Sequence, residues 1–350
     1  MFLAAYIISI ADENSAAANS FNTMQHLSAL KFFKFFLGIK NITLLILLIF
    51  ILFKTNVQAK DCLSFLPFGY NGQYTHLPLN SSFCVKEDNI IKNYLTDSYG
   101  GRILKDEFSK DFVEVFGDSQ VLGLDIINIK DHYLNSYYKK NLKIYAAPNN
   151  GPYEVLNFLH LNHKIIKNSI IVTFNFSVDI YRLSADWDPK NVVALNSDDL
   201  DEVLKNPVKY KLIIFKNFLF NKNFTLARNN NEEMQRLFIN SNKEKIINQL
   251  KIYYKNLDQV AKKYNLNIEY IITHPYWLYD KNNDGKLFLN QTLLENVNII
   301  ICESFKPTKN INKILVSHLY KELNLKDLTF DKRHLKSNKI KLFKLNNICE

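Results

Sequence analysis

The sequence predicts an α/β fold in which a parallel β-sheet follows a small strand-rich lead-in. Apolar, β-prone segments alternate with helical segments from about residue 111 onward, which is typical of βαβ units. With 350 residues, 47% of them hydrophobic, the chain is long and apolar enough for a sizeable core. We expect three regions: residues 1–59 as an N-terminal extension with a signal peptide or signal anchor, 60–110 as the lead-in, and 111–350 as the α/β domain with an insertion at about 182–235.

The N-terminal region has the pattern of an export signal. Three lysines precede an uninterrupted apolar run at residues 42–53, and Val57 and Ala59 occupy the small-residue positions of a cleavage site. The run is shorter than the ~20 residues of a spanning helix. We expect cleavage after Ala59, with membrane attachment through residues 29–53 as the alternative.

All four cysteines follow this signal, and an even number permits disulfides in an exported chain. Cys62 and Cys84 bracket a turn-rich stretch and are the favoured pair. Cys302 lies in an apolar run and fits an inert core thiol equally well. Cys349 then has no assigned partner at this stage.

The net charge of +10 is spread along the chain without a basic block or an arginine cluster, which argues against a nucleic-acid partner. Residues 280–285 (DKNNDG) match the first half of a calcium loop, but Gln291 stands where the loop needs a bidentate glutamate. A turn between two strand-like runs is the preferred interpretation. We predict neither a metal nor a cofactor.

The individual elements follow from apolar periodicity and turn residues. Residues 113–117 form the opening strand, which ends in a turn that carries Ser119. The elements expected after it, in chain order, are strands at 142–147 and 169–176 separated by a helix at 153–162, a strand at 210–215, an amphipathic helix at 242–264, strands at 268–273 and 297–302, and a helix at 314–323.

Three residues can form a nucleophilic triad. Ser119 follows the carboxyl end of a predicted strand, where open α/β sheets bind their ligands. Serine needs a base, usually histidine, and the base needs a carboxylate that orients it. Asp331 and His334 are three residues apart, so both side chains can reach one cleft. Candidate oxyanion donors are the Ser119 N–H, the loop at 149–151, and the side chains of Asn149, Asn150 and Asn175.

These residues resemble the SGNH (GDSL-type) hydrolases. Residues 117–119 (GDS) match the first block of that family, and residues 331–334 (DKRH) match the last. Residues 97–102 (DSYGGR) resemble the lead-in of exported members, and the loop at 148–153 resembles the second block. The third block departs from the family, because Val178 stands where an oxyanion asparagine is usual.

The resemblance implies a flavodoxin-like three-layer fold with a parallel sheet. It also implies that Ser119 is the nucleophile, His334 the base and Asp331 the acid that orients it. The family's second-block glycine falls on Asn149, with Gly151 two residues later. Asn175 is the nearest substitute for the missing asparagine, so the expected oxyanion set is completed as follows: Ser119, Asn149, Gly151 and Asn175.

We therefore expect an exported serine esterase that removes acyl groups from a cell-envelope glycan, in the periplasm or cell envelope of a bacterium. An O-acyltransferase of the same fold is one alternative. A non-catalytic glycan-binding or assembly protein is another, and Val178 favours it. The expected partner is the acylated glycan or another ester, and the oligomeric state stays open.

Overall fold

The fold is taken from a computed structural model of the chain. The predicted signal or anchor at residues 1–59 lies outside the described residues, and so do Asp331 and His334. The structure describes residues 62–87, 90–105, 111–124, 126–183, 195–207, 209–210, 212–213, 216, 232–328 and 335–349.

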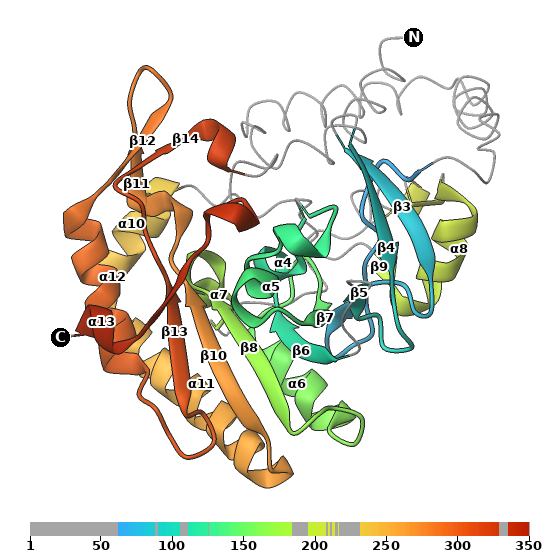
Figure 1. The fold of residues 1–350 in the computed structure, drawn as a ribbon, viewed down its shortest axis with the longest axis horizontal. Coiled ribbons are helices and arrows are strands. Elements are labelled where there is room, and N and C mark those ends of the chain that lie inside the picture. Colours follow the sequence, from blue (N-terminus) through green and yellow to red (C-terminus); the bar gives the residue numbers. More distant parts are fainter. Residues whose placement is uncertain are drawn as a thin grey trace, which may run out of the picture.

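A seven-stranded sheet forms the centre of the described protein (Figure 1). Its five central strands are parallel, and each edge strand runs antiparallel to its neighbour. The predicted parallel sheet is therefore confirmed in its central part. In spatial order the strands are β15 (Leu342–Lys344), β13 (Lys313–Ser317), β10 (Asn267–Thr273), β8 (Ser169–Asn175), β6 (Phe112–Gly117), β7 (Asn141–Ala146) and β5 (Arg102–Leu104).

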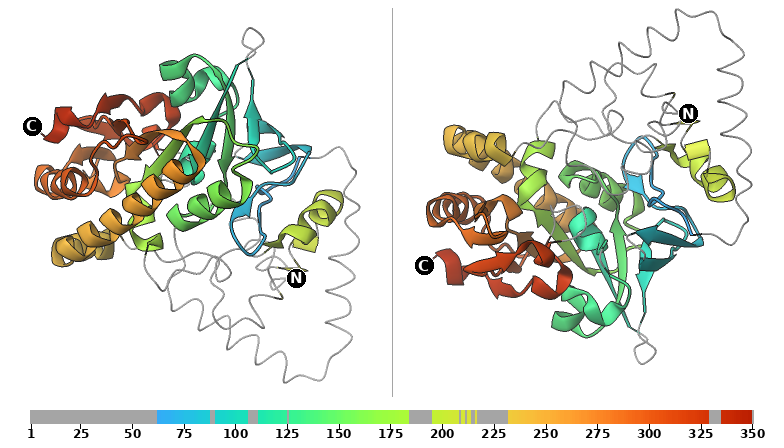
Figure 2. Two further views of the ribbon diagram at one scale, coloured as in Figure 1. Left: turned by 90° about the horizontal axis from the view of Figure 1, so that it is seen from below. Right: turned by 90° about the horizontal axis from the view of Figure 1, so that it is seen from above.

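Helices cover both faces of this sheet. α6 (Pro152–Asn162) and α11 (Lys243–Tyr264) lie on one face, with α12 (Gln291–Ser304) packed beside α11 (Figure 2). α4 (Ser119–Leu122) and α5 (Tyr133–Tyr138) lie on the other face (Figure 1). Strands covered on both faces are apolar along most of their length. β6, β8 and β10 follow this rule, which explains why they were readable in the sequence.

The lead-in is built from short strands and joins the main sheet. β3 (Ser82–Glu87) and β4 (Ile90–Leu95) form a hairpin, and β5 pairs with β7. β1 (Gly69–Tyr70) lies between β2 (Thr75–His76) and β9 (Leu195–Asn196). The other helices and strands are α7 (Phe176–Arg182), α8 (Leu200–Lys205), α10 (Glu232–Ser241), β11 (Tyr279–Lys281), β12 (Lys286–Leu289), β14 (Glu322–Asn324) and α13 (Asn346–Cys349).

Three predicted elements differ from the structure. The predicted strand at 297–302 is part of α12, in which Val297, Ile300 and Ile301 are buried at helical spacing. The predicted helix at 314–323 instead begins with β13, because its apolar start lies between β10 and β15. The predicted strand at 210–215 is helical at its described residues, namely 210, 212 and 213.

The calcium-like segment is a turn, as preferred from the sequence. β11 and β12 pair antiparallel around it, and the Asn282 side chain accepts the N–H groups of Asp284 and Lys286 at 3.1 and 2.9 Å. Asp280 is paired with Arg236. Among the described residues, no group of three or more His, Cys, Asp and Glu side chains is placed to hold a metal ion.

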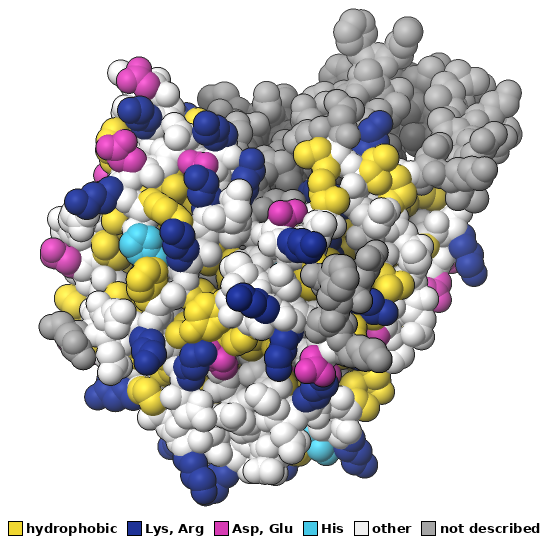
Figure 3. Space-filling view, in the orientation of Figure 1, with side chains coloured by type: hydrophobic (Ala, Val, Ile, Leu, Met, Phe, Trp, Pro, Cys, Tyr) yellow, Lys and Arg dark blue, Asp and Glu magenta, His cyan; other side chains and the backbone are white. Residues whose placement is uncertain are grey.

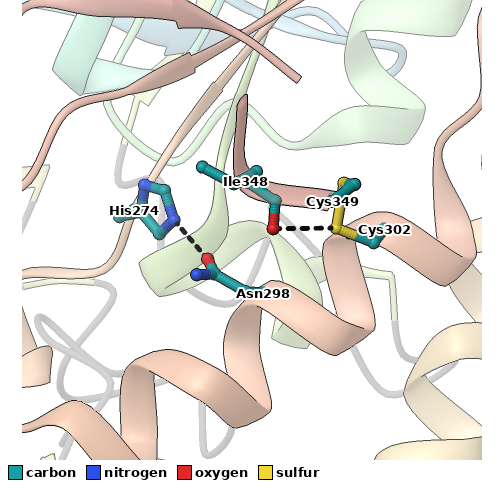
Figure 4. The surroundings of a disulfide bond; sticks show 5 residues. All are labelled: His274, Asn298, Cys302, Ile348 and Cys349. Carbon is teal, nitrogen blue, oxygen red and sulfur yellow. Dashed lines mark hydrogen bonds between the residues drawn. A yellow bond between two sulfur atoms is a disulfide. The ribbon is translucent and has the colours of Figure 1, made fainter. Parts of the chain in front are cut away.

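Two disulfides close loops in the described chain. Cys62 bonds to Cys84, the pair favoured from the sequence. Cys302 bonds to Cys349, which fastens α13 to α12 (Figure 4). Of the two possibilities left open for Cys302, the disulfide is therefore confirmed, and its partner lies 47 residues later in the chain. Such bonds are typical of proteins that fold in an oxidising compartment.

The surface charge is diffuse. Lys and Arg side chains are scattered over the face drawn in Figure 3, with acidic side chains between them. As for membranes, the helices within the described ranges include none with the length and apolar character of a transmembrane span.

Candidate functional site

The candidate site lies at the carboxyl edge of the parallel strands. Ser119 is the first residue of α4, which follows β6 after a single residue, Asp118. Ser119 is buried, with 8% of its surface exposed. Asn175 ends β8, the neighbouring strand, so the fold brings these two predicted site residues to the same edge. This edge is where open α/β sheets bind ligands.

The turn before Ser119 depends on two neighbouring residues. Gly117 lies so close to β8 that a Cβ atom there would overlap the Thr173 hydroxyl, which donates to the Phe116 carbonyl oxygen at 3.1 Å. Asp118 caps α4, because its carboxylate accepts the Gln120 N–H at 2.9 Å. Close packing therefore explains Gly117, and helix capping explains Asp118.

A buried arginine from the lead-in holds the other end of α4. Arg102 donates to the carbonyl oxygens of Leu122 and Gly123, both at 2.7 Å, and to that of Ile126 at 2.9 Å. These carbonyl groups lie at the end of the helix and just beyond it, where the backbone lacks helical partners. Arg102, the last residue of the lead-in segment 97–102, thus stabilises the end of the helix that begins with Ser119.

His132 also supports α4 and is not part of the catalytic prediction. Its Nδ1 atom accepts the Leu134 N–H at 3.2 Å, so its Nε2–H donates to the Val121 carbonyl oxygen at 2.9 Å. Burial lowers the pKa of His132 to about 4, and the nearby Arg102 charge acts in the same direction. The imidazole is therefore neutral at physiological pH.

Arg182 joins three segments of the candidate site. Its Nη1 atom lies 3.3 Å from Asp118 Oδ2, 3.1 Å from Asp179 Oδ1 and 2.7 Å from the Asn150 carbonyl oxygen. Burial raises the pKa of the Asp179 carboxyl, and the Asp118 carboxylate adds to this shift while Arg182 opposes it. One guanidinium thus lies between two buried acids.

Asn175 and Asn150 complete this buried network. The Asn175 side chain donates to Asp118 Oδ2 at 2.9 Å, and its backbone N–H donates to Asp179 Oδ2 at 2.8 Å. Asn150 donates its side-chain amide to the Gly117 carbonyl oxygen at 3.0 Å. Asn150 is one of the side chains that the sequence offers as an oxyanion donor, whereas Arg182 did not stand out there from ordinary helix residues.

The other two predicted oxyanion residues lie in the loop before α6. Asn149 has a φ of 65°, a left-handed conformation that asparagine tolerates better than most residues. The Gly151 N–H donates to the Glu154 carboxylate at 2.9 Å, which caps α6. These contacts give both residues a role in shaping the loop. Asn150, between them, is the residue whose side chain reaches the Ser119 turn.

A small cavity opens beside the Ser119 turn. It encloses about 10 Å³, roughly the space for one water molecule. Its walls combine hydroxyl, amide and imidazole groups with two aliphatic side chains. The lining residues are Gln120, Asn175, Thr273, His274, Tyr276, Ser317, Leu335 and Ile340.

His274 is the only lining residue with an imidazole, and both of its ring nitrogens have protein partners. Nδ1 lies 2.9 Å from the Ser317 carbonyl oxygen and Nε2 lies 3.0 Å from the Asn298 side chain (Figure 4). Burial lowers the pKa of His274. This geometry is that of a neutral, structurally bonded histidine.

The residues that flank the predicted acid–base segment are described. Leu328 and Leu335 form an antiparallel bridge. The Gln120 side-chain amide donates to the Leu335 carbonyl oxygen at 3.1 Å. A hydrogen bond therefore joins Gln120, the residue after Ser119, to Leu335, the residue after His334.

Comparisons of the chain with protein-family models, with curated proteins and with solved structures find no match.

Proposed function

We propose that this protein is an exported serine esterase that removes O-acyl groups from a cell-envelope glycan. The observation that carries the proposal is the bond between Gln120 and Leu335, which joins the residue after Ser119 to the residue after His334. A triad needs its serine and histidine on neighbouring backbone segments, although they are far apart in sequence. The short segment 329–334 would contribute both Asp331 and His334.

The order of the parallel strands also supports the proposal. When the central parallel strands are numbered along the chain, their spatial order across the sheet is 2-1-3-4-5. This is the strand order of flavodoxin-like sheets. In that fold the ligand lies at the carboxyl edge, next to the first strand. Here the first strand is β6, the strand that precedes Ser119.

In the proposed reaction, the Ser119 hydroxyl attacks the ester carbonyl while His334 removes its proton and Asp331 orients the imidazole. The Ser119 N–H and the Asn175 amide would stabilise the oxyanion. Collapse of the tetrahedral intermediate breaks the bond to the sugar oxygen, which leaves as the alcohol with the proton from His334. Water then hydrolyses the acyl-serine by the same route and releases the acid.

Location follows from the same picture. The export signal predicted at residues 1–59 and the two disulfides support folding outside the cytoplasm. The periplasm or cell envelope of a bacterium is the compartment that we propose, and it is where an acylated envelope glycan would be met.

The test is hydrolysis of an activated acetate ester by the purified protein and by its Ser119→Ala and His334→Ala variants. We expect each variant to lose at least about a thousandfold in kcat. A sugar acceptor in the same assay shows whether water or a hydroxyl takes the acyl group, which separates the esterase from the acyltransferase. Equal rates in all three proteins would overturn both and favour the non-catalytic binding protein.

A further inference from the structure

We infer that Arg182 is a positioning residue of the candidate site, acting through Asp118 on the amide of Asn175. The inference rests on the proposed function, because it assigns Arg182 to the stabilisation of an oxyanion. Arg182 lies in α7, the helix that replaces the family's usual third block. Sequence patterns gave it no role.

The position of Arg182 is tightly constrained. Only 8% of its side chain is exposed, and its Nη1 atom is within 3.3 Å of oxygen atoms of Asp118, Asn150 and Asp179. Its stem crosses Gly151, where a Cβ atom would approach the arginine Cβ to 3.0 Å and the Cδ to 3.1 Å. The glycine therefore makes room for the arginine, and one side chain joins α7 to the loops after β6 and β7.

The charge of Arg182 matters as much as its shape. It contacts Asp118 and Asp179, whose side chains are only 2% and 4% exposed. Burial disfavours ionised carboxylates, and a guanidinium at hydrogen-bond distance favours them. The guanidinium makes a charge-assisted contact with Asp118 at 3.3 Å and holds that side chain in place. Asp118 accepts from both the Gln120 N–H and the Asn175 side chain, so Arg182 stabilises both bonds.

Asn175 connects the Asp118 carboxylate to the cavity beside the Ser119 turn. Its side-chain nitrogen donates to Asp118 Oδ2 at 2.9 Å, which fixes the orientation of the amide. Asn175 also lines the cavity beside Gln120. An amide held by Asp118 presents a fixed dipole to this cavity, and a fixed donor stabilises a developing oxyanion better than a mobile one. Arg182 does not line the cavity, so its role is to orient.

The test is a double-mutant cycle between Arg182→Lys and Asn175→Ala in the full chain, with kcat and KM measured for an activated acetate ester. We expect Arg182→Lys to lower kcat about 30-fold with KM within about twofold, and Asn175→Ala to lower kcat about 100-fold. In the Asn175→Ala background, Arg182→Lys should add less than about twofold, because its effect passes through Asn175.

Two further variants make the result specific. Arg236→Lys is the matched control: Arg236 donates to the carbonyl oxygens of Trp277 and Tyr279 at 2.9 and 2.7 Å, outside the network, and kcat should stay within about twofold. Asp118→Asn keeps an N-cap acceptor but removes the charge that Arg182 contacts. The loss of kcat in Asp118→Asn should match that in Arg182→Lys, and the double variant should lose no more than either single variant. If Arg182→Lys does not fold, Asp118→Asn takes its place in the double-mutant cycle.

The outcomes are distinct. The inference would be overturned if the losses in kcat multiply in the double variant, or if Arg182→Lys leaves kcat unchanged. Ser119-dependent turnover in the wild type would still uphold the proposed function in that case. Absence of that turnover in the wild type would overturn the proposed function, and the inference would fall with it.

Discussion

The side-chain amide of Gln120 donates to the carbonyl oxygen of Leu335, a residue 215 positions later in the chain, at 3.1 Å. This bond joins the helix that begins with Ser119 to the end of the predicted acid–base segment. Replacing Gln120 by leucine removes the bond and keeps a side chain of similar size.

We expect Gln120→Leu to lower kcat up to about tenfold, because a single hydrogen bond contributes about 0.5–1.5 kcal/mol. KM for a small activated ester should change little. The matched control is Gln259→Leu in α11, on the opposite face of the sheet, which should leave kcat unchanged. An identical kcat in both variants would show that the bond does not order the site.

The small cavity predicts a preference for short acyl groups. Leu335 and Ile340 are its aliphatic wall, and its space, about that of one water molecule, has room for a terminal methyl group but not for a longer chain. We expect an ester with two acyl carbons to react at least about tenfold faster than one with six, and Ile340→Ala to reduce this ratio, since removing buried methylene groups enlarges a cavity. A series of nitrophenyl esters measures it. A ratio that Ile340→Ala does not change would exclude this cavity as the acyl site.

His132 predicts a pH-dependent stability. The native imidazole has a pKa of about 4 against 6.5 in the unfolded chain, so between these values the unfolded state binds the extra proton. The contribution of His132 is present above pH 6.5 and is lost as the pH falls toward 4, by about 3 kcal/mol in all. Burial lowers the pKa of His76 and His274 too, so the wild-type slope includes them.

His132→Asn isolates one of these contributions. Asparagine retains a capping acceptor for the Leu134 N–H and does not titrate. The free energy of unfolding, measured with urea from pH 4.5 to 7.5, should fall less steeply with acid in the variant than in the wild type. Parallel curves would mean that another group carries the titration.

Gly117 predicts a specific suppressor. In Gly117→Ala, the new methyl group would overlap the Thr173 hydroxyl and approach Val121 Cγ1 to 2.9 Å. We expect a loss of about 3 kcal/mol in the free energy of unfolding, as for other overpacked sites. Adding Thr173→Ala removes the hydroxyl and should recover about half of that loss. Two losses that simply add would contradict the predicted contact.

The sheet was largely readable from the sequence because buried parallel strands are continuously apolar. The same property made the prediction at 297–302 wrong, because this apolar run belongs to α12. Its buried residues, with Leu293 one turn earlier, form one face of that helix. At 314–323 the run is short, and only pairing with β10 and β15 makes it a strand. Local composition does not contain that pairing.

The candidate site was readable only where chemistry is local. Ser119 follows a strand and a glycine, a pattern visible in the chain. The direction of a loop side chain is not visible, so the sequence offers Asn149 and Asn150 alike, and only the structure shows that Asn150 contacts Gly117. Arg182 was not predicted, since two of its three acceptors, Asp118 and the Asn150 carbonyl oxygen, come from loops that are distant in the sequence.

Among the strands that the structure describes, β5 and β15 are the two edges of the central sheet. Each has three residues and runs antiparallel to its neighbour. A long, straight parallel strand at an edge is a template onto which another chain can add. Short reversed strands shield the longer strands β7 and β13 from such addition. We expect the folded protein to resist edge-to-edge aggregation, and removal of β15 to expose β13 and make concentrated solutions form aggregates.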